Sequence, residues 1–122
     1  MTTNIVDKDG NSIAAADATV PSDRHFRNAW SLSGSTITED ITESKKIFQD
    51  KIREVRNPLL AEEDVVYMKA LEADDSDAKT ASVAKKKALR DAPAASAISS
   101  ADTIAKLKAA WDTSTLGDSP YA

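Results

Sequence analysis

Residues 37–60, with the sequence ITEDITESKKIFQDKIREVRNPLL, contain the apolar pattern that decides the fold. The large apolar residues of this pattern are Ile41, Phe48, Ile52, Val55 and Leu59. Their spacing of seven, four, three and four residues places all five side chains on one face of an α-helix. We therefore predict a helix over about residues 38–56.

The charges around this stretch fit the two ends of a helix. Thr36 followed by Glu39 fits a capping box, and Asp40 adds negative charge near the positive end of the helix dipole. The later turns suit the negative end because they carry the basic residues Lys45, Lys46, Lys51, Arg53 and Arg56.

Asn57-Pro58 interrupts the pattern, since asparagine caps helices and proline favours their first turn. We expect a second helix over about residues 58–73. The junction is too short for a free loop, so the two helices form either one kinked rod or a tight corner.

Two further helices are expected after the polar break at residues 73–79. The first, over about residues 77–91, is rich in Ala and Lys and has a weak apolar face, with Val83 and Leu89 as its large apolar residues. The second begins at Ser99 or Ser100 and carries Ile104, Leu107 and Trp111 at helical spacing. The tail after it is expected to be extended.

The N-terminal residues favour β structure. Residues 1–15 resemble a hairpin with Asp9-Gly10 as a type I′ turn, in which both central residues need positive φ. The segment FRNAWSL, residues 26–32, fits a short strand.

These elements predict a mainly α fold: a helical hairpin of three to four helices with a short N-terminal β-hairpin and an extended C-terminal tail. We divide the chain into an N-terminal β or extended arm (1–36), a helical hairpin body (37–92), and a short helix with the tail (93–122). Heptads are not sustained, which argues against a long coiled coil.

Composition limits the core and excludes several functions. The 122 residues suffice for one domain, and an aromatic content of 5% predicts a thin core that needs a partner or self-association. A net charge of −4 argues against a nucleic-acid binder. The polar N-terminus is unlike a signal peptide, and no apolar run could span a bilayer, so we expect a soluble protein without a membrane partner.

No motif in the chain predicts a metal or cofactor site. The DKDGN stretch at 7–11 resembles the start of an EF-hand loop, but Ser12 and Ala18 occupy the positions that need Gly and Glu. The acidic runs at 62–64 and 74–77 fit helix ends. The basic run at 84–90 contains no aromatic residue for base stacking, and the chain has no cysteine.

The stretch DRHFRNAWSL, residues 23–32, is the most distinctive string in the chain and holds its only histidine. His25 beside Asp23 could act as a general base, but no nucleophile stands near it in sequence, so we predict no catalytic residue and no enzyme. Arg, Trp and aromatic side chains anchor many interfaces. The predicted partner-binding residues are Arg24, Phe26, Arg27, Trp30, Trp111 and Tyr121. In the alternative, Phe26 and Trp30 cover the helices while the arginines pair with acidic surface.

Residues 51–93 and the segment VPSDRHFRNAW at 20–30 carry a family resemblance. The pattern along 51–93 begins with an Arg-rich helix, a Leu pair and an Asp. It continues with a second apolar helix, a polar break and a basic helix. The residues of this pattern are Arg53, Arg56, Leu59, Leu60, Asp64, Leu71, Lys87, Leu89, Arg90, Asp91 and Pro93. Together the two segments resemble small tail proteins of tailed bacteriophages, namely tail-fibre assembly, tail-chaperone-like and related small virion proteins of marine and cyanobacterial phages. The resemblance covers about residues 20–111.

The resemblance implies a non-enzymatic virion structural protein at the tail or tail fibres, acting as an adaptor or decoration. Its expected partners are other phage tail or tail-fibre proteins, in multiple symmetric copies. It would be made in the cytoplasm of the host bacterium and located in the virion. The alternative is a tail or tail-fibre assembly chaperone that leaves the particle.

Overall fold

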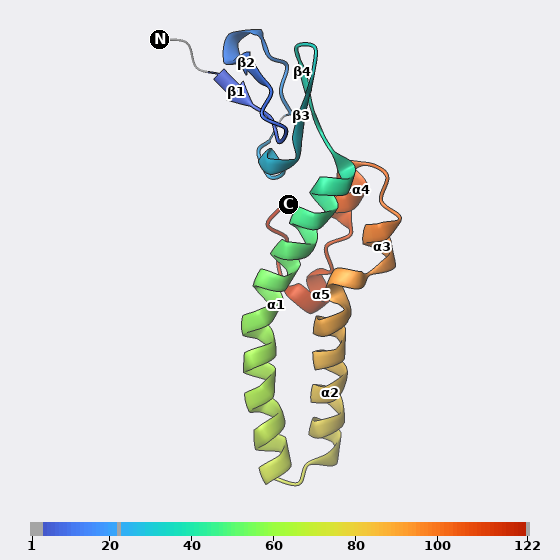
Figure 1. Cartoon of the computed structure of the whole chain (residues 1–122). Helices are drawn as coiled ribbons and strands as arrows, with labels where there is room; N and C mark the ends of the chain where they lie inside the picture. The colour runs from blue at the N-terminus through green and yellow to red at the C-terminus, as the bar shows by residue number, and fades with distance from the viewer. Residues whose placement is uncertain (1–3, 22, 122) are drawn as a thin grey trace.

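The computed structural model describes residues 4–21 and 23–121, and Figure 1 shows their arrangement. In chain order the elements are β1 (Asn4–Val6), β2 (Ser12–Ala14), β3 (Trp30–Ser33), β4 (Thr36–Glu39), α1 (Ile41–Glu72), α2 (Ser76–Asp91), α3 (Ser96–Ser99), α4 (Ile104–Ala109) and α5 (Thr113–Leu116), with short 3-10 turns between some of them. The mainly helical fold with a helical hairpin and a short N-terminal β-hairpin is confirmed.

Helices α1 and α2 form the long hairpin of the molecule, and Figure 1 shows them side by side with their connection at the lower tip. Residue Asp74 reverses the chain there with a φ of 51°. Asp75 then caps α2, since its carboxylate accepts the N–H of Ala78 at 3.0 Å. The helix predicted over about 77–91 is therefore confirmed to within one residue.

Helix α1 is capped by Asp40, whose carboxylate accepts the N–H of Glu43 at 3.1 Å. The predicted capping box from Thr36 to Glu39 is wrong. Both residues belong to β4, where Thr36 pairs with Ser33, so their backbone is extended. The helix consequently begins at Ile41 instead of at about residue 38.

Pro58 lies inside α1 and does not end it. Proline cannot donate the hydrogen bond to the carbonyl four residues earlier, which costs about 3 kcal/mol relative to alanine. Contacts with α2 hold the helix on both sides of this point. The Arg56 guanidinium donates to the carbonyl of Arg90 at 2.9 Å, and the Ser82 hydroxyl donates to the carbonyl of Glu63 at 3.3 Å. The prediction of a second helix starting at about residue 58 is wrong, whereas a single rod, one of the two arrangements left open by the sequence, is observed.

The hydrophobic core lies where the first half of α1 meets the C-terminal helices and the residues before β3. Its buried members are Phe26, Ala29, Phe48, Ile52, Leu89, Ile98, Ala101, Leu107, Trp111 and Leu116. Within the predicted stripe of α1, Phe48 and Ile52 are buried, while Ile41, Val55 and Leu59 pack partly buried against them. The predicted apolar face of α1 is thus confirmed.

The first hairpin, β1 with β2, has a different turn from the one predicted. Val6 pairs with Ser12, so residues 7–11 form the loop. The type I′ assignment to Asp9-Gly10 is wrong, because Asp74 is the one non-glycine residue with positive φ in the described part of the chain. The Asp7 carboxylate shapes the loop instead by accepting the N–H groups of Asp9 and Asn11 at 2.9 and 2.8 Å.

The second hairpin, β3 with β4, was not predicted. Its strands join through Gly34 and Ser35, with a φ of 64° at Gly34, as in a type II′ turn. The strand predicted over 26–32 is wrong in its first half. Residues Arg27–Ala29 form a 3-10 turn, and β3 begins only at Trp30.

The C-terminal segment folds back onto α1 in short helices (Figure 1). The helix expected from Ser99 or Ser100 begins at Ile104 instead, because Thr103 provides the capping oxygen at 3.2 Å from the N–H of Lys106. The expectation of an extended tail is wrong over α5, which buries Leu116 in the core.

Candidate functional site

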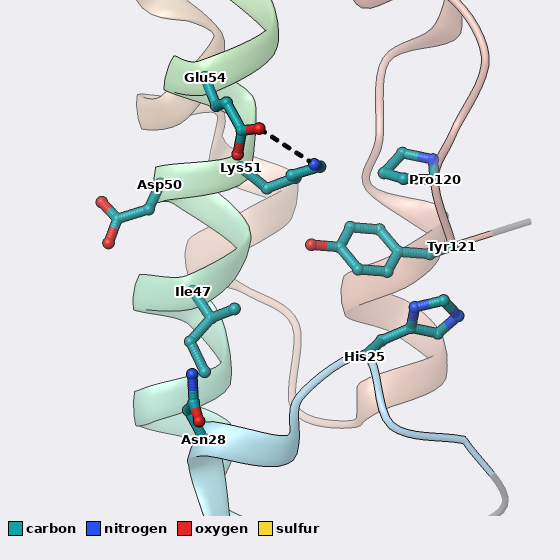
Figure 2. A pocket seen from close by; sticks show the side chains of 8 residues that line it. All are labelled: His25, Asn28, Ile47, Asp50, Lys51, Glu54, Pro120 and Tyr121. Carbon is teal, nitrogen blue, oxygen red and sulfur yellow. Dashed lines mark hydrogen bonds and ion pairs between the residues drawn. The ribbon is translucent and has the colours of Figure 1, made fainter.

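A pocket of about 490 Å³ lies between the segment before β3, helix α1 and the C-terminal tail. Figure 2 shows its lining, which is His25, Asn28, Ile47, Asp50, Lys51, Glu54, Pro120 and Tyr121. The pocket therefore joins residues from both ends of the chain to the first half of α1. The folded-back tail creates it, so an extended tail would have left this face of α1 open.

Tyr121 is the centre of the aromatic cluster that holds the tail in place. Its ring stacks on Phe26 and Phe48, with centroid distances of 5.2 and 5.4 Å. His25 and Trp111 complete the cluster in T-shaped contacts with this ring, at centroid distances of 5.1 and 6.0 Å. Such offset and edge-to-face pairs add stabilisation beyond their buried area, so the tail is anchored and the pocket has a defined aromatic wall.

The Tyr121 hydroxyl is a hydrogen-bond donor at neutral pH. Burial of the phenol, together with the negative charge of Glu54, raises the pKa of Tyr121 to about 12. A phenol that keeps its proton can donate to a carbonyl or carboxylate of a bound group, and it cannot act as a base.

The charges that line the pocket are largely paired within the chain. Asp50 accepts from the guanidinium of Arg53 at 2.9 Å, and Lys51 contacts Glu54 at 3.4 Å, as the dashed line in Figure 2 marks. The eight lining residues include no Ser, Thr or Cys. This lining is suited to holding a polar group. The absence of catalytic residues in the chain stays a prediction.

Three of the predicted partner-binding residues are core residues. Phe26, Trp30 and Trp111 are 0%, 3% and 5% exposed. The indole N–H of Trp111 donates to the carbonyl of Gly117 at 3.1 Å. Their burial favours the alternative in which the rings cover the helices.

The predicted arginines lie beside one of those rings. The guanidinium groups of Arg24 and Arg27 are 5.6 and 4.7 Å from the centre of the Trp30 ring, within cation–π range. Tyr121 lines the pocket and is partly exposed. The parts of the predicted epitope within reach of a partner are therefore Arg24, Arg27 and Tyr121, and their role in binding stays a prediction.

A charged cluster beside this segment was missed by the sequence analysis. The Lys108 ammonium hydrogen-bonds to the Asp23 carboxylate and thereby lowers the pKa of Asp23. Burial raises the pKa of the nearby Glu39, and the charge of Asp23 adds to that rise. Asp23 and Lys108 are 85 positions apart, so no local pattern could have paired them.

Across residues 4–21 and 23–121, no three or more side chains of the metal-binding types gather where they could hold an ion. In the same residues no helix combines the length and the apolar character that crossing a membrane requires. No protein-family model, curated protein or solved structure matches this chain.

Proposed function

We propose that this chain is a non-enzymatic structural protein of a tailed phage, bound at the tail or tail fibres, where it acts as an adaptor or decoration by binding other proteins. The binding part of the proposal is supported by the far half of the α1–α2 hairpin. The virion part rests on the resemblance of residues 20–111 to small phage tail proteins.

The seam between the two helices in that far half contains small and polar side chains. Its buried residues are Glu63 and Ala70 from α1 and Ser82 from α2. The larger apolar side chains of the same region lie outside the seam and are about half exposed: Val65, Val66, Met68, Leu71 and Val83. This is the single observation that carries the binding function, because exposed apolar residues gathered in one region mark sites of association.

Helix packing gives the physical reason. A helix normally turns its apolar stripe toward the core, and the first half of α1 does so with Phe48 and Ile52. Beyond Leu60, the last α1 residue that packs against the core, the same helix projects away beside α2 (Figure 1). The projecting half thus presents apolar side chains that a partner protein can cover.

The experiment that tests this function is quantitative mass spectrometry of purified particles of the phage whose genome encodes the chain. A fixed copy number per tail is the expected result. Absence from the particles, together with co-purification of the chain with a free tail or fibre subunit from infected cells, would replace the structural role by the assembly-chaperone alternative. A coding sequence outside any phage or prophage genome would overturn both.

A further inference from the structure

One side of the projecting hairpin carries both apolar and charged residues in a regular arrangement. On α1, Asp64, Met68 and Leu71 follow at helical spacing and share one side of the helix. On α2, Val83, Lys87 and Arg90 do the same. We call these six residues the hairpin face.

The two halves of this face lie on the same side of the hairpin. Lys86, the neighbour of Lys87, reaches across to the Asp64 carboxylate at 2.6 Å and lies 4.8 Å from the centre of the Tyr67 ring. These contacts fix the side to which Asp64 and Lys86 turn, whereas Lys85 contacts Glu63 at 3.4 Å. Met68, Leu71 and Val83 are 54%, 48% and 50% exposed on it.

The two helices carry opposite charge along this half of the hairpin. On the hairpin face α1 contributes the acidic Asp64 and α2 contributes the basic Lys87 and Arg90. Within one copy, Asp64 also contacts Lys86 at 2.6 Å and Lys87 contacts Asp91 at 3.6 Å. One hairpin therefore complements a second copy of itself when α1 of one lies on α2 of the other. A symmetric dimer requires this kind of self-complementary surface.

We propose that the hairpin face binds a second copy of this chain. The twofold axis runs parallel to the helices, so that α1 of each copy lies on α2 of the other in an antiparallel four-helix arrangement. Met68 of one copy then meets Val83 of the other, and Asp64 faces Lys87. Both hairpin tips point the same way, which places the two β regions together at the other end.

The small size of the face favours a weak association. Sixteen helical residues span about 24 Å, and two helices side by side are about 20 Å wide, which gives roughly 500 Å² per copy. That area is at the low end for specific interfaces, so we expect a dissociation constant on the order of 10–100 µM. The inference concerns the purified chain in solution and does not depend on the virion assignment.

Sedimentation equilibrium of the purified full chain, from about 5 µM to about 500 µM, tests the proposal. The wild type should pass from monomer to dimer within that range. Val83→Asp buries an unpaired carboxylate against Met68 of the other copy and should weaken the dimer at least about tenfold. Val20→Asp is the matched control, because Val20 is 44% exposed but lies outside the hairpin, and it should dimerise like the wild type.

A mixing experiment tests the orientation. Met68→Lys and Val83→Asp should each weaken the homodimer, whereas an equal mixture should associate again. In the mixed dimer one contact pairs the new lysine with the new aspartate, and the other contact keeps the wild-type residues. Any of three results would overturn the proposal. They are a monomeric wild type at the highest concentration, a dimer unaffected by Val83→Asp, and failure of the mixture to associate. Circular dichroism of each variant should match the wild type, since both positions are exposed.

Discussion

Pro58→Ala tests whether α1 is one continuous helix. Proline inside a helix costs about 3 kcal/mol relative to alanine, because it removes a backbone hydrogen bond and crowds the preceding turn. Pro58 is exposed, so the substitution loses little packing. The unfolded chain of the variant is more flexible, which lowers the free energy of unfolding by about 0.4–1 kcal/mol. We therefore expect a net gain of about 2 kcal/mol in the free energy of unfolding, which corresponds to a rise of about 8 °C in Tm.

The assay is urea unfolding followed by far-ultraviolet circular dichroism, with Asn57→Ala as the matched neighbour. In a continuous helix Asn57→Ala should be neutral or stabilise by about 0.5 kcal/mol, from helix propensity. If Pro58 instead began a second helix capped by Asn57, Asn57→Ala would cost about 1 kcal/mol and Pro58→Ala would bring no gain. That pair of results would refute the continuous helix.

Three further predictions concern the core, the pocket and the N-terminal loop. Phe48→Ala removes a fully buried ring and should destabilise the protein by about 3–5 kcal/mol in urea unfolding, whereas a change below about 1 kcal/mol would contradict its place in the core. Because the pKa of Tyr121 is raised to about 12, the folded state should lose stability as pH rises from about 10, and Tyr121→Phe should abolish that loss in urea titrations across this range. The N–H of Leu32 and further hydrogen bonds lower the pKa of Asp7 from 3.8 to about 2, so its stabilisation is present at neutral pH and is lost as pH falls through that interval. Asp7→Asn should reduce this loss of stability at acid pH. An unchanged loss would show that Asp7 does not stabilise the loop.

The spacing of apolar residues was sufficient to predict the buried face of α1 but not the ends of that helix, whereas the helix predicted after the polar break matches α2 to within one residue. The stripe from Ile41 to Leu59 is a local signal, and it predicted the buried face of α1. The capping residue was misassigned, since β4 pairs with β3 and keeps Thr36 extended. The helix start predicted at Pro58 was wrong for a similar reason. The contacts of α1 with α2 outweigh the local preference of proline for the first turn of a helix.

The candidate site was hardly predictable, because it depends on contacts between distant segments. His25 and Tyr121 come from opposite ends of the chain, and only the folded-back tail brings their rings together. The burial of Phe26 and Trp30 likewise depends on tertiary packing, so composition alone left their two roles open. The exposed apolar residues of the hairpin also became visible only once its seam was known to contain Glu63, Ala70 and Ser82.

We propose that this chain binds other proteins in a phage particle through its projecting hairpin. The most direct test is the copy number of Val66→Asp and Val20→Asp variants in particles, measured by quantitative mass spectrometry against the wild type. Val66 is 47% exposed on the hairpin and lies outside the face assigned to the second copy. We predict that Val66→Asp lowers incorporation at least about tenfold, while Val20→Asp is incorporated normally. Equal incorporation of both variants would contradict the claim.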